Sequence, residues 1–138
     1  NGGNTTGKLS AGAFINFAET NAYKSTQIVK FSRLIMKGDV KDGDRLLFSD
    51  AWHPGVLQCR YMADLRPIKL SIDVMWHAGS YDRFDLLGQD RRIQRWSLDF
   101  ERSVFRAASR NYFATKFHRN ILRTRPRCMI LFRKKHAT

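Results

Sequence analysis

The sequence predicts an α/β fold, namely a Rossmann-like parallel sheet flanked by helices. Segments with helical periodicity alternate along the chain with short apolar segments, which is the order that βαβ units produce. A chain of 138 residues is long enough for one domain with a single core. Hydrophobic residues make up 43% of the chain, so we expect it to fold rather than remain a disordered polyelectrolyte.

A helix is expected early in the chain, after a loop rich in Gly and Asn at residues 1–7. A helical pattern begins near Leu9, breaks near Thr20 and Asn21, and resumes after Ser25, a residue type that favours the N-cap position. The resumed pattern predicts one apolar helix face, formed by Ile28, Phe31 and Ile35.

Two strands and an intervening helix are expected next. The apolar run at residues 45–50 predicts a buried strand. Pro54 suits the first turn of a helix, which Arg66 and Pro67 end. Residues 68–76 alternate apolar and polar side chains, which gives the clearest strand pattern in the chain.

The second half of the chain continues the alternation after a loop at residues 77–90. A long amphipathic helix is predicted at residues 91–109, a strand at 111–115, a short helix at 116–124 and a last strand at 127–132. The long helix is expected to bury one stripe in the core, formed by Ile93, Trp96, Phe100, Val104 and Ala107.

Positive charge is concentrated at the end of the chain. Residues 1–101 carry 14 Lys and Arg against 12 Asp and Glu, whereas residues 102–138 carry 11 Lys and Arg and no acidic residue. Such a block favours binding of a polyanion such as nucleic acid, a solvated basic tail being the alternative. We therefore divide the chain into a Rossmann-like domain at residues 1–118 and a basic segment at 119–138. The residues predicted to bind nucleic acid are Arg102, Arg106, Arg110, Lys116, Arg119, Arg123, Arg125 and Arg127, of which the first three are spaced to share one face of the long helix.

Composition also predicts where the protein works. The sequence contains neither an apolar run long enough to span a membrane nor the apolar core of a secretion signal. Its two cysteines, Cys59 and Cys128, are too few for a disulfide framework. We expect a cytoplasmic protein with reduced thiols and no membrane partner. The His, Cys and Asp spacings match no metal-ligand pattern, so we expect no metal site.

Polar side chains follow each predicted strand, where parallel sheets concentrate function. His77 and Asp82 follow the clearest strand, and we predict them to be catalytic. Imidazole accepts or donates a proton near neutral pH, and a nearby carboxylate orients it or deprotonates a hydroxyl itself. The predicted substrate-binding residues are Asp50, Trp52, His53, Tyr81, Asp85 and His118.

Six of these eight residues also have a structural interpretation. His77 fits a capping or partly buried histidine, and His118 an ordinary surface residue. The carboxylates fit capping roles, Asp50 for the helix that starts at Pro54 and the two later ones for turns. The tyrosine fits plain cover for the core.

Three segments resemble a known family. They are "GDRLLFSDAWHPG", "WHAGSYDRFDLLG" and "NYFATKFH", within roughly residues 38–118. In this order they resemble the N-terminal, acceptor-side domain of GT-B glycosyltransferases of the kind that tailed phages encode. The resemblance implies half of a two-domain architecture, with the active site in the cleft between two Rossmann-like domains.

The resemblance also implies partners. A nucleotide sugar would be the donor substrate, no cofactor would be bound tightly, and a second domain or chain would hold most of the nucleotide-sugar contacts. The acceptor would be a hydroxyl, with a modified base in DNA as one example, and a phage-encoded enzyme would work in the host cytoplasm. The alternative function is a non-catalytic, basic nucleic-acid-binding protein on a Rossmann-like scaffold.

Overall fold

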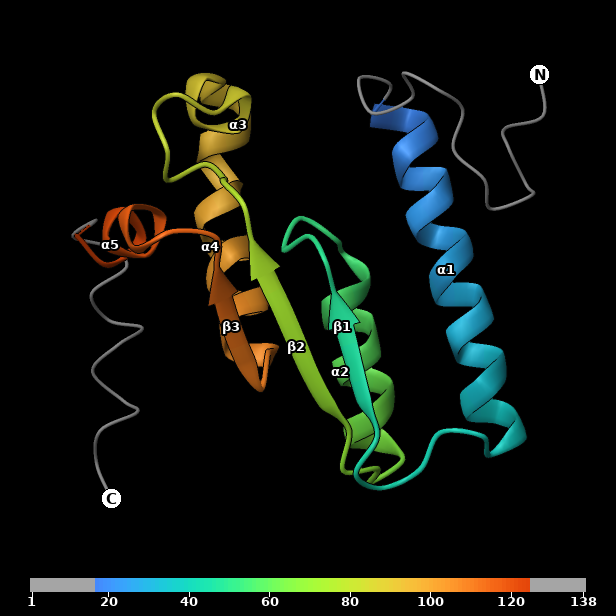
Figure 1. The fold of residues 1–138 in the computed structure, drawn as a ribbon. Helices are drawn as coiled ribbons and strands as arrows, with labels where there is room; N and C mark the ends of the chain where they lie inside the picture. The colour runs from blue at the N-terminus through green and yellow to red at the C-terminus, as the bar shows by residue number, and fades with distance from the viewer. Residues whose placement is uncertain (1–16, 125–138) are drawn as a thin grey trace. The chain divides into compact units, whose positions relative to one another are not determined.

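The computed structural model describes residues 17–124, which form two compact units. Residues 17–44 and 53–70 form one of them, which we call the helical unit. Residues 45–52 and 71–124 form the other, which we call the sheet unit. Figure 1 labels the elements along the chain. Each unit is described by itself.

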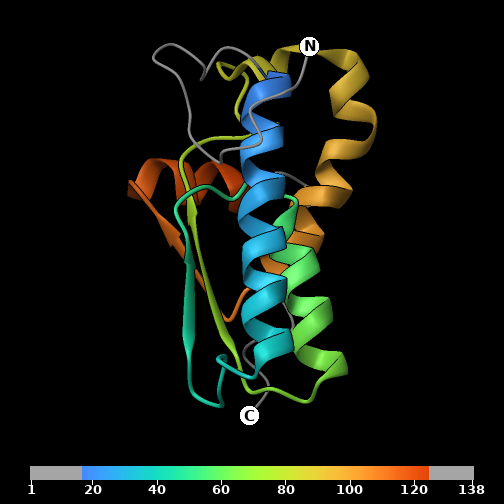
Figure 2. The same cartoon turned by 90° about the vertical axis from the view of Figure 1, so that its right-hand side faces the viewer.

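The helical unit consists of two helices that pack against each other, α1 (Phe17–Lys37) and α2 (Gly55–Leu65) (Figure 2). The predicted break near Asn21 is wrong, because α1 is continuous there and Ser25 lies inside the helix rather than at its N-cap. The Asn21 side chain donates a hydrogen bond to the Phe17 carbonyl (2.7 Å). A polar side chain that bonds to its own helix in this way is compatible with helical backbone despite its low propensity.

The helix α2 begins and ends as predicted, after Pro54 and before Arg66. Gly55 starts it because the site has no room for a side chain: a Cβ atom there would overlap the Ile28 side chain of α1. The glycine therefore lets the two helices approach closely. Ser32 completes the contact, with its hydroxyl 3.3 Å from the Met62 sulfur.

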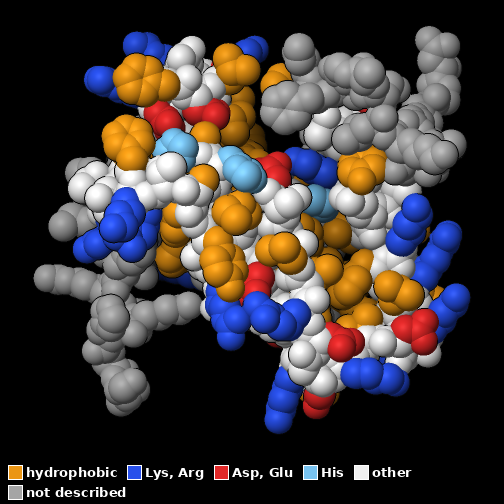
Figure 3. All heavy atoms as spheres, viewed as in Figure 1, with side chains coloured by type: hydrophobic (Ala, Val, Ile, Leu, Met, Phe, Trp, Pro, Cys, Tyr) orange, Lys and Arg blue, Asp and Glu red, His pale blue; other side chains and the backbone are white. Residues whose placement is uncertain are grey.

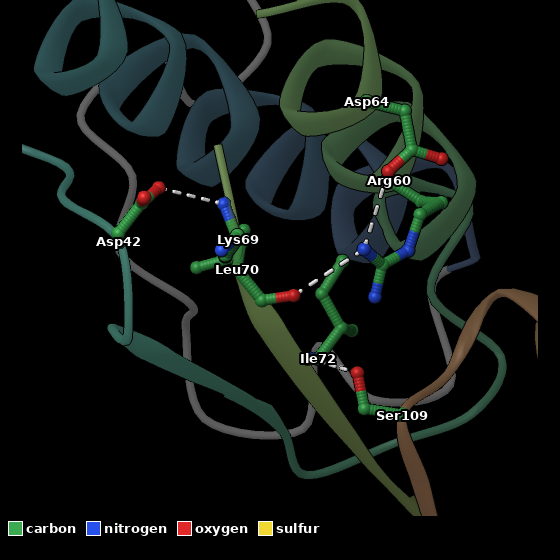
Figure 4. A network of polar contacts seen from close by, with 7 residues as sticks. All are labelled: Asp42, Arg60, Asp64, Lys69, Leu70, Ile72 and Ser109. Atoms are coloured by element: carbon green, nitrogen blue, oxygen red, sulfur yellow. Dashed lines mark hydrogen bonds and ion pairs between the residues drawn. The ribbon is translucent and has the colours of Figure 1, made fainter. Parts of the chain in front are cut away.

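The segment that follows α2 is tied down by polar contacts (Figure 4). Arg60 donates to the Leu70 carbonyl (3.3 Å) and also contacts Asp64 (3.4 Å). The Lys69 amide donates to the Asp42 carboxylate (2.9 Å). These contacts hold the chain in the helical unit until the next strand begins.

The sheet unit contains a parallel, open, three-stranded sheet in the order β1-β2-β3. Its strands are β1 (Arg45–Phe48), β2 (Ser71–Trp76) and β3 (Arg110–Phe113). The α/β class and the parallel sheet are confirmed, and both are compatible with a Rossmann-like fold. The predicted strand at 127–132 lies outside the described residues.

The core of the sheet unit is built around Trp76, which is fully buried at the end of β2. Its ring stacks on Phe113 with centroids 6.2 Å apart, and Phe105 lies at the same distance. The indole N–H donates to the Asn111 side chain (2.8 Å), which satisfies the polar atom of this large apolar residue.

Three helices belong to the sheet unit: α3 (Leu86–Gln89), α4 (Arg91–Ala107) and α5 (Lys116–Thr124). The sequence pattern did not predict α3, whereas α5 has the predicted bounds. The Thr115 hydroxyl accepts from the His118 amide (3.2 Å) in the first turn of α5. Because α5 is continuous past residue 118, the domain boundary predicted there falls inside a helix.

The buried side of α4 differs from the predicted apolar stripe. Trp96 is 52% exposed, whereas two polar residues, Ser97 and Glu101, are buried. The helix also ends at Ala107, so Arg110 belongs to β3, and the helix face expected to carry Arg102, Arg106 and Arg110 does not exist. Apolarity alone mislocates the buried side because this helix buries the Glu101 carboxylate, which has hydrogen-bond partners in the loop after β2.

One face of the sheet is exposed within this unit. Figure 3 shows hydrophobic side chains between basic ones over the strands, and Leu47 and Tyr112 are among the exposed large hydrophobic residues. On β2, Asp73 is buried and pairs with Arg45 of β1. The hydrogen bond from Arg45 lowers the pKa of Asp73.

None of the helices among residues 17–124 is both long enough and apolar enough to cross a membrane.

Candidate functional site

The three strands of the sheet unit are parallel, so their carboxyl ends lie at one edge of the sheet. The segments that leave this edge begin at Ser49 after β1, at His77 after β2 and at Ala114 after β3. Ligands bind most often at this edge of open α/β sheets. We call these segments, with the α4 residues that hold them, the carboxyl edge.

His77 lies at the carboxyl edge with an exposed side chain. Its ring Nε2 is 2.7 Å from the backbone carbonyl oxygen of Ser49. A carbonyl oxygen only accepts, so Nε2 must carry the hydrogen, and the neutral ring then has Nδ1 as its acceptor. The contact therefore selects one tautomer and orients the ring.

The loop after His77 is fixed by Glu101, a residue of α4 that is only 2% exposed. Its Oε1 accepts from the Ser80 amide (2.6 Å) and from the Trp52 indole N–H (3.1 Å). Its Oε2 accepts from the Ser80 hydroxyl (2.7 Å). One buried carboxylate thus ties the segments after β1 and β2 to α4.

Gly79 is required by the same arrangement. A Cβ atom at this position would overlap Glu101 Oε1 and would lie 2.8 Å from the Tyr81 ring and 3.0 Å from the Trp52 indole nitrogen. Contacts this close do not occur for real Cβ atoms unless a neighbour shifts. The loop can therefore approach Glu101 only with a glycine here.

Trp52 forms an aromatic group with two residues of α4. Its ring centroid lies 4.8 Å from that of Phe100 and 5.8 Å from that of Trp96. Trp52 is partly buried, and the exposed Trp96 ring extends the group to the surface. The predicted substrate-binding residue Trp52 thus lies at the carboxyl edge as one side of an aromatic wall.

Asp82 pairs with His118, which brings together one residue predicted to be catalytic and another predicted to bind substrate. Asp82 Oδ2 lies 3.8 Å from His118 Nε2, and its Oδ1 accepts from the Phe84 amide (2.9 Å). The expectation that Asp82 orients His77 is not what these contacts show, because the ring of His77 is oriented by a backbone carbonyl instead.

The remaining predicted residues of the sheet unit make structural contacts. Asp85 is the N-cap of α3 and accepts from the Leu87 amide (2.8 Å). Asp50 accepts from the Trp52 amide (3.0 Å). Tyr81 is buried, with its ring 6.3 Å from that of Trp76.

His53 belongs to the helical unit and is buried there. Its Nδ1 accepts from the Gly55 amide (3.0 Å), and its Nε2 lies 3.1 Å from the Gln27 side-chain oxygen. His53 therefore caps the start of α2, the role for which the sequence offered Asp50 as a candidate. The helix has no other side-chain cap at Pro54.

The predicted nucleic-acid-binding residues are divided among three elements. Arg102 contacts Asp99 (3.2 Å) on α4, while Arg106 and Arg110 are exposed. Three exposed cations lie on α5, namely Lys116, Arg119 and Arg123. Arg125 and Arg127 lie outside the described residues.

Sequence reasoning missed Ser80 and Glu101, the residues that fix the loop after β2. One signal was present: Ser97 and Glu101 precede the buried Val104 and Phe105 at spacings of three to eight residues, which repeats one side of a helix. The exposed rings of Phe84 and Phe117 were also missed, because an apolar side chain is expected to be buried and its exposure is known only from the fold.

No group of three or more His, Cys, Asp or Glu side chains within residues 17–124 is arranged to hold a metal ion. The fold and this edge define the class of the sheet unit: an open, parallel α/β sheet compatible with a Rossmann-like fold. Comparison with known proteins found no matching family model, no matching curated protein and no matching solved structure.

Proposed function

We propose that the sheet unit is the acceptor-side part of a glycosyltransferase, which moves a sugar from a nucleotide sugar to a hydroxyl group. The observation that carries the proposal is His77, an exposed imidazole at the carboxyl end of β2 with its Nε2 on the Ser49 carbonyl (2.7 Å). The three resembling segments of the sequence include both of these residues.

The proposed chemistry uses the free ring nitrogen of His77. Nδ1 takes the proton of the acceptor hydroxyl while the oxygen of that hydroxyl forms a bond to the anomeric carbon of the sugar. The bond between that carbon and the phosphate oxygen breaks, and the nucleoside diphosphate leaves with the electron pair. The Ser49 carbonyl stabilises the imidazolium that forms, because Nε2–H remains hydrogen-bonded to it.

Asp82 has a positioning role in this proposal. Its backbone amide donates to the Gly79 carbonyl (2.9 Å), and its carboxylate accepts from the Phe84 amide. The residue therefore sets the path of the loop between His77 and α3. Trp52 and the exposed Trp96 supply apolar surface against which a sugar ring packs.

The test is a transfer assay on the complete protein, with release of nucleoside diphosphate measured from UDP- and GDP-sugars in the presence of hydroxyl acceptors. We expect His77→Ala to lower the transfer rate by about 100-fold or more, the usual contribution of a general base. Tyr61→Ala is the control, because Tyr61 is an exposed residue of α2 in the helical unit. Transfer by His77→Ala at the wild-type rate would remove His77 from the mechanism.

A further inference from the structure

Two exposed phenylalanine rings neighbour the Asp82–His118 pair in the sequence, since Phe84 follows Asp82 by two residues and Phe117 precedes His118. Phe84 is 70% exposed and Phe117 61% exposed. The Phe84 amide donates to Asp82 (2.9 Å), and the Phe117 ring centroid lies 5.8 Å from that of His118. We call these four residues the ring cluster. It joins the loop after β2 to α5.

The exposure of both rings is energetically unfavourable for the isolated protein, because burying apolar surface away from water would lower the free energy. The Arg83 guanidinium lies 4.6 Å from the centroid of the Phe84 ring, within the range of a cation–π contact. Such a contact keeps one face of the ring beside a cation at the surface. The arrangement suits a ligand that combines flat rings with negative charge.

Further positive charge lies on α5, the helix that carries Phe117 and His118. Lys116, Arg119 and Arg123 are exposed and are spaced by three and four residues, so they share one side of the helix. With Arg83 they outnumber the nearby carboxylates of Asp82 and Asp85. The surface therefore complements a ligand with repeated phosphates.

We propose that the ring cluster binds single-stranded nucleic acid, with bases stacked on Phe84 and Phe117 and phosphates on Arg83, Lys116 and Arg119. Alternating aromatic rings and cations are the usual means of binding a single strand without sequence preference. A duplex keeps its bases stacked inside, so it cannot use the rings. A membrane surface fits less well, because inserting both rings would strip water from the His118 imidazole, which lies beside Phe117 with its side chain 25% exposed. The proposal is independent of the proposed sugar transfer.

The rings are tested by fluorescence anisotropy with labelled oligothymidine, without any sugar donor. We expect Phe84→Ala and Phe117→Ala each to weaken binding by about 5-fold to 150-fold, the range found when a stacking residue is removed. The salt dependence should stay unchanged, because neither variant alters charge. Tyr61→Ala is the matched control, since it removes an aromatic ring that is 65% exposed in the other unit.

The charges are tested by the salt dependence of the same binding. We expect Arg119→Gln to lower the slope of log affinity against log salt by about 0.7, the value for one phosphate contact on a single strand. Lys30→Gln, which removes an exposed charge on α1, should leave the slope unchanged.

Three results would overturn the proposal. One is that both phenylalanine variants bind the oligonucleotide with wild-type affinity. Another is that the wild type binds a duplex of the same length as tightly as the single strand, and that the variants lose the same affinity for the duplex. The third is that removing the rings weakens binding of the protein to anionic phosphatidylserine vesicles but leaves its binding to the oligonucleotide unchanged. Circular dichroism of each variant establishes that it is folded, which is expected because both rings are exposed.

Discussion

Replacing Glu101 with alanine tests whether this residue holds the loop after β2. The variant removes every acceptor atom of a carboxylate that receives hydrogen bonds from the Ser80 amide, the Ser80 hydroxyl and the Trp52 indole. Ser80 is 1% exposed, so water cannot replace the acceptor there. Each buried polar group left unpaired costs about 1–3 kcal/mol.

The partly buried Trp52 indole can be solvated, and the Ser80 hydroxyl can rotate, so we expect a loss of about 3 kcal/mol in the free energy of unfolding. With a urea m-value of about 2 kcal/mol/M, the midpoint should fall by about 1.5 M. Glu101→Gln keeps one acceptor oxygen and should lose about 1–2 kcal/mol. Asp99→Ala is the control, because the Asp99 side chain is 80% exposed on the same helix and should change stability by less than about 0.5 kcal/mol.

Urea unfolding followed by far-UV circular dichroism gives these differences. If Glu101→Ala were as stable as Asp99→Ala, the carboxylate would not hold the loop, and the assignment of the carboxyl edge as a preformed site would be wrong.

Three further predictions follow from single residues. Burial raises the pKa of Cys59 to about 12. In a Cys128→Ser variant, we therefore expect the Cys59 thiol to react with Ellman's reagent at pH 8 only after the protein is unfolded. Fast labelling of the folded protein would contradict this. Hydrogen bonds from Arg92 lower the pKa of Asp90 from 3.8 to about 2. The contribution of Asp90 to stability is therefore complete above pH 4 and is lost as the pH falls toward 2. Urea unfolding at several pH values should show that the stability of Asp90→Asn depends less on acid than the stability of the wild type. Gly79→Ala should destabilise the sheet unit by about 1–3 kcal/mol, the usual range for overpacking. Gly43→Ala, at a position with no atom within 4 Å of an added Cβ but with φ of +90°, should cost about 1 kcal/mol through backbone strain alone. A smaller cost for Gly79→Ala than for Gly43→Ala would contradict the crowding at Gly79.

Local patterns in the sequence predicted the elements of the fold well. The alternation at residues 68–76 contains β2, and the short helix predicted at residues 116–124 has the bounds of α5. Proline and arginine ended α2 where expected, since the residue before a proline disfavours helical backbone. The predicted helix break near Asn21 was wrong because the Asn21 side chain donates a hydrogen bond to the helix backbone, and helix propensity does not account for such a contact.

The contacts of the candidate site were less predictable. Position after a strand selected His77, whose exposed side chain lies at the carboxyl edge, but its orienting partner is the backbone of Ser49, which carries no side-chain signal. The pairing of Asp82 with His118 joins the loop after β2 to the helix α5, so sequence distance hides it. Glu101 was missed because a buried carboxylate is tolerated only through its partners, and those partners are known only from the fold.

The most direct test of the proposed transfer site is the ¹⁵N NMR spectrum of the His77 ring, recorded alone and with a nucleotide sugar and a hydroxyl acceptor. We expect the tautomer with hydrogen on Nε2 in the free protein, and a change at Nδ1 when both substrates are present. Hydrogen on Nδ1, or a ring that responds to no nucleotide sugar and acceptor, would contradict it.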